Sequence, residues 1–100
     1  MTREELRAAL DASVARLVAR AAAERWPLRN DHCFLRVAYD NAVGAKWDTV
    51  YARPAWRSLP LDRLMAAVGF VEAIEHEGVE RLLELNAISL GVRRTYRAGK

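Results

Sequence analysis

Apolar residues recur at three- and four-residue steps along most of the chain, which is the pattern of amphipathic helices. Thr2 and Glu5 form a capping box, in which the hydroxyl and the carboxylate each satisfy a free backbone N–H at a helix start. Pro27 disfavours helical conformation in the residue before it. The pattern therefore predicts a long helix over residues 3–24, whose buried stripe consists of Leu6, Leu10, Val14, Leu17, Val18 and Ala21.

The stretch from Asn30 to Trp47 predicts a central helix over residues 31–43, because its apolar positions nearly encircle a helix. Asn30 or Asp31 can cap its start. Gly44 is a suitable stop, since glycine tolerates a positive φ. The apolar surface leaves only one narrow polar stripe, formed by His32, Arg36 and Asp40 at four-residue spacing.

A third helix is predicted over residues 60–77, with Ser58 as its cap and Pro60 in its first turn, where a missing N–H costs little. Gly78 closes it. Its expected buried face consists of Leu61, Leu64, Met65, Val68, Val71 and Ile74.

A fourth helix is predicted over residues 79–90, ended by Gly91 as a C-cap. Its apolar positions are Val79, Leu82, Leu83, Ile88 and Leu90, with Asn86 among them. Residues 44–59 form an aromatic connector with one helical turn at 55–57, and their TVY run is too short and isolated to start a sheet. We therefore expect an all-α, compact bundle of about four helices, with a single domain over 1–92 and a flexible basic tail over 93–100.

Composition supports one globular domain, because 52% of the 100 residues are hydrophobic and 29% are charged. Cys33 is the single cysteine, so no internal disulfide can form, and no secretory signal is recognisable. These features favour a cytoplasmic location. The longest apolar runs are far shorter than the roughly 20 residues that span a bilayer, so no membrane partner is expected.

Charge is unevenly distributed along the chain. Residues 1–58 carry 10 basic and 7 acidic groups, residues 59–92 carry 2 and 6, and residues 93–100 carry 4 and 0. This polarity suits pairing between copies of the chain as well as it suits a nucleic-acid partner.

The second predicted helix contains the residue types of a thiol nucleophile, a base and an orienting acid, namely Cys33, His32 and Asp40. Adjacent helical positions point about 100° apart, which is an unusual geometry for a catalytic pair, so a small buried cysteine is the favoured interpretation. His76 and Glu80 lie one turn apart, but two histidines and no paired cysteines make a weak metal signal. No metal and no cofactor are expected.

Arginines supply the candidate binding residues. Arg36 could bind an anionic partner while Asp40 fixes its guanidinium, although such stripes are usually solvated helix faces. Arg53 and Arg57 lie among tryptophans, as single-stranded nucleic-acid binding requires. The alternative interpretation is that the aromatic rings cover the core and the arginines lie at the surface. The tail offers Arg93 and Arg94 for phosphate contacts, but such tails are common and unspecific.

The phrase NDHCFLRVAYDNAVGAKWDTVYARPAW resembles the signature of a group of small, mostly uncharacterised bacterial proteins, some of which carry the label of GCN5-related acetyltransferase. The resemblance covers about residues 26–90. It implies, without assigning roles, that the family pattern includes Asn30, Asp31, His32, Cys33, Arg36, Asp40, Asn41, Trp47 and Asp48.

The functional expectation is a small helical interaction module, favoured over an enzyme, that forms a homo-oligomer and has an unidentified protein partner. The long amphipathic first helix and the opposite charges of 59–92 and 93–100 support self-association. Nucleic-acid binding through the basic tail with Arg53 and Arg57 is one alternative. An acetyltransferase-related enzyme or accessory protein is the other.

Overall fold

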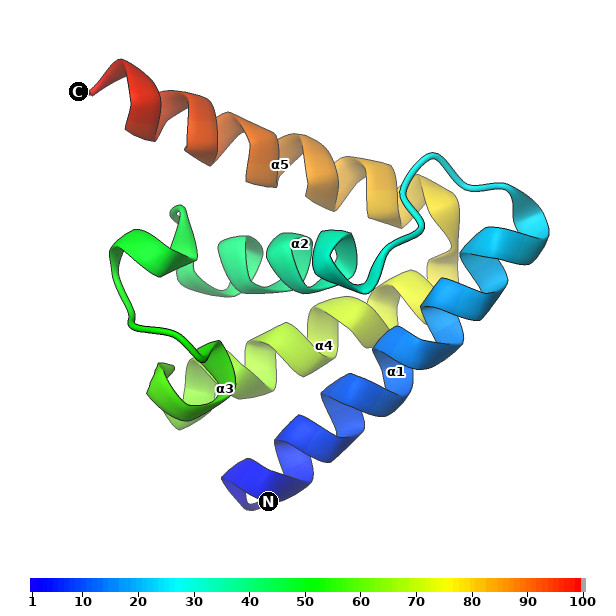
Figure 1. The fold of residues 1–100 in the computed structure, drawn as a ribbon, viewed down its shortest axis with the longest axis horizontal. Helices are drawn as coiled ribbons and strands as arrows, with labels where there is room; N and C mark the ends of the chain where they lie inside the picture. The colour runs from blue at the N-terminus through cyan, green and yellow to red at the C-terminus, as the bar shows by residue number, and fades with distance from the viewer. Residues whose placement is uncertain (100) are drawn as a thin grey trace.

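The computed structural model describes residues 1–99, and Figure 1 shows them as an assembly of helices. The elements are α1 (Arg3–Glu24), α2 (Asp31–Val43), a 3-10 turn η1 (Trp47–Thr49), α3 (Ala55–Ser58), α4 (Leu61–Glu77) and α5 (Val79–Ala98). No strand occurs within residues 1–99, so the predicted all-α bundle is confirmed.

The bounds of α1 agree with the sequence prediction because local signals determine both of its ends. Thr2 and Glu5 form the expected capping box, in which the Glu5 N–H donates to Thr2 Oγ1 at 3.1 Å and the Thr2 N–H donates to Glu5 Oε1 at 2.9 Å. Arg25 ends the helix in the left-handed conformation with φ of 57°.

Helix α2 lies in the middle of the molecule, between α5 on one side and α4 with α1 on the other (Figure 1). Its bounds also match the prediction, and Gly44 ends it with a φ of 78°. Packing around α2 builds one hydrophobic core, whose largest fully buried side chains are Phe34, Leu10, Leu17, Leu59, Leu64, Ile74 and Leu82.

Several predicted core positions are in fact exposed. On α4, Leu61 and Met65 are 42% and 54% exposed, because the buried face of that helix runs through Leu64, Ala67, Val68, Val71 and Ile74. On α5 the exposed apolar side chains are Leu83, Ile88 and Leu90. The α5 face that packs inward contains Leu82, Leu85 and Ser89, so it becomes polar toward its C-terminus.

The predicted helix end at Gly91 and the flexible tail after it are both wrong, because α5 continues to Ala98. Gly91 has no positive φ, and a helix tolerates an interior glycine at a cost of about 1 kcal/mol. Tertiary contacts favour the longer helix: Arg93 forms an ion pair with Asp40, and the Lys46 ammonium lies 5.5 Å from the centroid of the Tyr96 ring. Residue 100, part of the predicted tail, lies outside the described residues.

The connector between α2 and α4 is more ordered than a plain loop. It contains η1 and the short helix α3, which confirms the helical turn predicted at 55–57. Ser58 ends α3 and does not cap the next helix, whose N-cap is Pro60. Arg3 of α1 donates to the carbonyls of Trp56 and Leu59, and thereby holds the end of α3 against the bundle.

Within residues 1–99, no helix combines the length and the apolar character needed to cross a bilayer.

Candidate ligand-binding cleft

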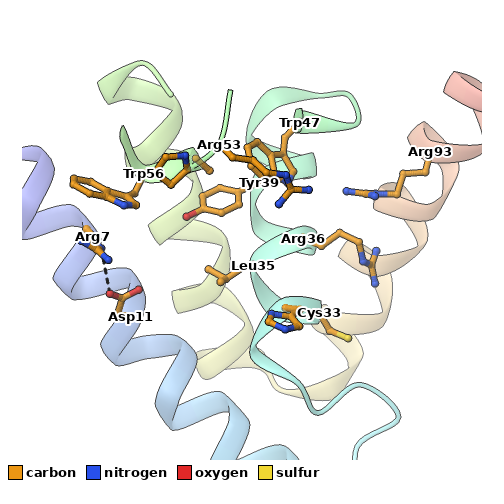
Figure 2. Close-up of a pocket in the computed structure, with 13 residues that line it drawn as sticks. Arg7, Asp11, Cys33, Leu35, Arg36, Tyr39, Trp47, Arg53, Trp56 and Arg93 are labelled. Carbon is orange, nitrogen blue, oxygen red and sulfur yellow. Dashed lines mark ion pairs between the residues drawn. The ribbon is translucent and has the colours of Figure 1, made fainter. Parts of the chain in front are cut away.

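A hollow of about 590 Å³ opens over the exposed side of α2 (Figure 2). Its size falls within the range of small-molecule sites. Helix α1, the connector and α5 surround it. The side chains that line it include Arg7 and Asp11 of α1, then His32, Cys33, Leu35, Arg36 and Tyr39 of α2, Trp47, Arg53 and Trp56 of the connector, and Arg93 of α5.

Asp40 is fully buried beneath this cleft, and both of its carboxylate oxygens accept hydrogen bonds from η1 and α5. Its Oδ1 accepts from the Trp47 backbone N–H at 3.1 Å, and its Oδ2 accepts from the Ser89 hydroxyl at 2.6 Å. Arg93 donates to both oxygens. A buried carboxylate is tolerated only with such partners, so Asp40 has a structural role in joining α2, η1 and α5.

Arg36 is bound differently from the sequence expectation. Asp40 does not fix its guanidinium; Arg36 Nη1 donates to Ser89 Oγ at 2.7 Å and Nη2 donates to Asn86 Oδ1 at 2.8 Å. Both partners are neutral, and Arg36 forms no ion pair with any described residue. The polar stripe of α2 is therefore neither simply solvated nor internally paired: it faces α5 at Arg36 and Asp40 and water at His32.

Two further arginines accompany Arg36. Figure 2 shows Arg36 and Arg93 on the side of α2 that faces α5, and the Arg53 guanidinium lies 5.1 Å from the centroid of the Trp47 ring. Arg93 is paired with Asp40, and Arg53 Nη2 lies 2.7 Å from Asp48 Oδ2. These carboxylates neutralise two of the three guanidinium groups, which leaves Arg36 as the one without a described counter-charge.

The carboxyl group of Asp48 is held ionised by the connector itself. A hydrogen bond from Lys46 at 2.8 Å, together with the hydrogen bond from Arg53, keeps the pKa of Asp48 below its usual range. Asp48 therefore positions Arg53 at the edge of the cleft as a stable ion pair.

Tyr39 contributes a polar group on the other side of α2. Tyr39 is only 7% exposed, and no hydrogen bond of its hydroxyl is described. Since no buried side-chain oxygen within residues 1–99 lacks a partner, this hydroxyl reaches solvent. Figure 2 shows this hydroxyl pointing into the space between α2 and α1. Burial, with a smaller contribution from the negative charge of Asp11, raises the pKa of Tyr39 to about 12, so the phenol is a protonated donor at neutral pH.

The tryptophans mainly support the structure. Trp47 is buried and packs against Tyr39 with ring centroids 5.3 Å apart. Trp56 is half-buried, and the guanidinium groups of Arg7 and Arg57 lie 4.3 and 5.3 Å from its ring centroid. These contacts agree with the interpretation that the rings cover the core.

The residues considered for nucleophilic catalysis do not assemble into a bonded triad. His32 is exposed, with Nδ1 3.2 Å from Asp31 Oδ1. Cys33 is half-buried at the edge of the cleft and forms no described hydrogen bond with His32. The Asp40 oxygens are occupied by Arg93, Ser89 and Trp47 as described above, so Asp40 does not orient His32.

The remaining candidate residues lie outside the cleft. Arg57 and Arg94 are exposed, the first on α3 and the second near the C-terminal end of α5. Glu75, close to the weak metal candidate, is engaged by Ser13 and Arg16 of α1. Across residues 1–99, no group of three or more histidine, cysteine, aspartate and glutamate side chains is arranged to hold a metal ion.

The sequence interpretation missed several residues of this site. Arg7 and Asp11 lie off the apolar stripe of the first predicted helix and have no role in the sequence predictions, which place Asn86 among the apolar positions of the fourth helix. Ser89 and Tyr39 had no assigned role. One sequence signal could have identified them. Polar residues occupy positions 86, 89 and 93 of the last helix, which is otherwise apolar on one face, and this pattern indicates a polar contact surface.

No family model, curated protein or solved structure matches this chain. The GCN5-related acetyltransferase fold is built around a mixed sheet, and residues 1–99 contain no strand. The geometry of the cleft is therefore the basis for inferring a function.

Proposed function

We propose that this protein is a small helical binding module, and that the cleft over α2 binds an anionic group through Arg36. The guanidinium of Arg36 carries this proposal, because it is held in place by the neutral side chains of Asn86 and Ser89. A guanidinium has more N–H donors than these two bonds use. A preorganised arginine with unused donors binds carboxylate or phosphate oxygens well.

Burial and neighbouring charges support the same assignment. Arg36 is half-buried at the wall of a 590 Å³ hollow, where partial desolvation strengthens a charge-assisted hydrogen bond. Arg53 and Arg93 add positive potential beside it, although each is paired with a carboxylate. The arrangement favours binding over catalysis, since no nucleophile and base that are hydrogen-bonded to each other are described in the cleft.

An amide NMR titration with sodium acetate and with inorganic phosphate, at constant ionic strength, tests this proposal. We expect concentration-dependent shifts at Arg36, Asn86 and Ser89. Arg36→Gln should weaken binding roughly tenfold or more, since a hydrogen bond to a charged group contributes about 1.5–3 kcal/mol. Arg97→Gln, which removes an exposed α5 charge outside the cleft, should leave the affinity nearly unchanged. Equal weakening by both variants would contradict a specific site.

Self-association is a second candidate, supported by the apolar side chains that α5 turns outward. Leu83, Ile88 and Leu90 are 44%, 52% and 40% exposed. A second copy of the chain would remove them from water. Light-scattering mass should then exceed that of one 11.3 kDa chain at high concentration, and Leu83→Gln with Leu90→Gln should shift the mass toward the monomer. A strictly monomeric species at high concentration would exclude this candidate.

Nucleic-acid binding remains the alternative for the basic groups outside the cleft. Arg57, Arg94 and Arg97 are exposed and could contact phosphates. Titration of labelled single-stranded nucleic acid at two salt concentrations tests it, because phosphate-driven affinity falls steeply as salt rises. A cytoplasmic location stays part of the proposal, in keeping with the single free Cys33.

A further inference from the structure

A second hollow of about 550 Å³ adjoins the cleft, and both hollows are lined by Asp11 and Leu35. The second hollow lies between α1 and the start of α2. Its α1 wall consists of Val14, Ala15 and Val18, and residues 29–31 close its other end. The shared lining makes the two hollows neighbouring parts of one groove along α1 and α2.

The two parts of the groove differ in chemistry. Arg36 and Arg93 lie on the side of α2 that faces α5, and Arg53 lies over the Trp47 ring, whereas Leu35 and Tyr39 lie on the side that faces α1 (Figure 2). Leu35 is only half-buried although α2 is otherwise a core helix. The groove therefore combines a positively charged end with a strip of accessible apolar surface.

We propose that the ligand of this groove is a linear amphiphilic carboxylate, with its carboxylate on Arg36 and its hydrocarbon chain across Leu35 toward Val18. This inference rests on the proposed anion site and adds the nature of the ligand body. Charge complementarity places the head group, since the planar fork of a guanidinium matches the two oxygens of a carboxylate. Burial of the apolar strip provides the favourable free energy for the chain.

The polar groups along this path are compatible with such a ligand. Asp11 lies where the two hollows meet, but Arg7 is its ion-pair partner at 3.7 Å, which reduces repulsion of an anion. The Tyr39 hydroxyl is protonated at neutral pH and reaches the solvent of the cleft, so it can donate to an oxygen of the ligand. Arg29 lies at the other end of the second hollow, and its Nε donates to the Trp26 carbonyl at 2.7 Å.

Calorimetric titration of the full chain with acetate, hexanoate, octanoate and decanoate, all below micelle-forming concentrations, tests this inference. We expect the affinity to rise roughly two- to fourfold for each added methylene that reaches the groove. Methyl NMR signals of Val14, Val18 and Leu35 should shift with the longer chains and remain still with acetate.

Matched variants separate this inference from the proposed anion site. Leu35→Gln and Val18→Gln should each reduce the chain-length dependence and leave acetate binding unchanged, whereas Arg36→Gln should weaken all four ligands. Leu61→Gln, at an exposed leucine of α4 that lines neither hollow, is the control and should change neither. If acetate binds but the affinity does not rise with chain length, the proposal of an amphiphilic ligand is overturned and the anion site stands. Failure of every ligand would overturn both, and chain dependence insensitive to Leu35→Gln and Val18→Gln would overturn the placement of the chain.

Discussion

Asp40 of α2 and Arg93 of α5 form a bidentate ion pair across 53 residues of sequence, with Nε and Nη2 of Arg93 donating to the two carboxylate oxygens at 2.6 and 3.2 Å. Asp40 is fully buried, whereas the Arg93 side chain is 22% exposed. The pair joins the central helix to the C-terminal half of α5, beside the wall of the cleft.

Asp40→Ala should therefore destabilise the fold by about 3–5 kcal/mol, the usual effect of removing one partner of a buried ion pair. Besides Arg93, the substitution leaves the Trp47 N–H and the Ser89 hydroxyl without their acceptor. Urea unfolding measures the loss, and amide exchange should show faster opening of residues 89–98. Glu84→Gln, at an exposed residue paired with Arg81, should cost less than about 1 kcal/mol. Equal effects would contradict the structural role of Asp40.

Two glycines should respond in opposite directions to replacement by alanine. Gly91 is an interior residue of α5, and an added Cβ would lie 4.0 Å from its nearest neighbour, so Gly91→Ala should stabilise the protein by about 0.5–1 kcal/mol. Gly44 has a φ of 78° and open space around it, so Gly44→Ala should cost about 1–2 kcal/mol through backbone strain alone. Thermal unfolding of the two variants checks both signs. If Gly91→Ala instead lowers the stability, α5 ends at Gly91 in solution and does not continue past it.

Acid should weaken the contact between α1 and α4. The hydrogen bond from Arg16, with a further one from Ser13, holds the pKa of Glu75 below its ordinary value. A lowered folded-state pKa stabilises the protein above the unfolded-state pKa, and this contribution disappears as the pH falls through the folded-state value. Glu75→Gln should reduce the free energy of unfolding at pH 7, and its difference from the parent protein should shrink toward pH 3.

Urea titrations of the parent protein and Glu75→Gln at pH 7, 5, 4 and 3 measure this dependence. Glu84→Gln again serves as the control because it removes an exposed carboxylate of α5. A Glu75→Gln difference that stays constant from pH 7 to pH 3 would contradict the assignment.

Cys33 offers a chemical report on the occupancy of the cleft. Its half-buried thiol lines the same hollow as Arg36, so a bound ligand should shield it. We expect saturating decanoate to slow alkylation by the neutral reagent N-ethylmaleimide several-fold, and Arg36→Gln to remove this protection at the same ligand concentration. Protection that persists in Arg36→Gln would mean that the ligand shields Cys33 from another position.

The sequence predicted those features that local chemistry determines. The capping box at Thr2 and Glu5 and the glycine at 44 set the ends of α1 and α2, and these bounds agree with the structure. The predicted end of the last helix was wrong because the contacts made beyond Gly91 come from α2 and the connector. Arg93 pairs with Asp40, 53 residues earlier, and the Tyr96 ring contacts Lys46, 50 residues earlier.

The candidate site was predictable only in part. Periodicity identified the stripe that contains Arg36 and Asp40, but the same spacing suggested that these two residues pair with each other. The partner of each residue lies on α5, and no local rule of helix spacing contains that information. Tyr39 was missed because an aromatic side chain on an apolar helix gives no sign in the sequence that its hydroxyl opens into a cleft.

The shared acceptor at Asp40 also constrains how sequences related to this one can diverge. Losing Arg93 alone would leave a buried carboxylate without its cation, and losing Asp40 alone would remove the anion that holds Arg93 on α2. Either single step lowers stability, whereas joint loss of both charges leaves neither a buried carboxylate nor a guanidinium without its counter-charge. In an alignment of true relatives, positions 40 and 93 should therefore change together, while position 47, which contributes only a backbone N–H to Asp40, should vary independently of that exchange.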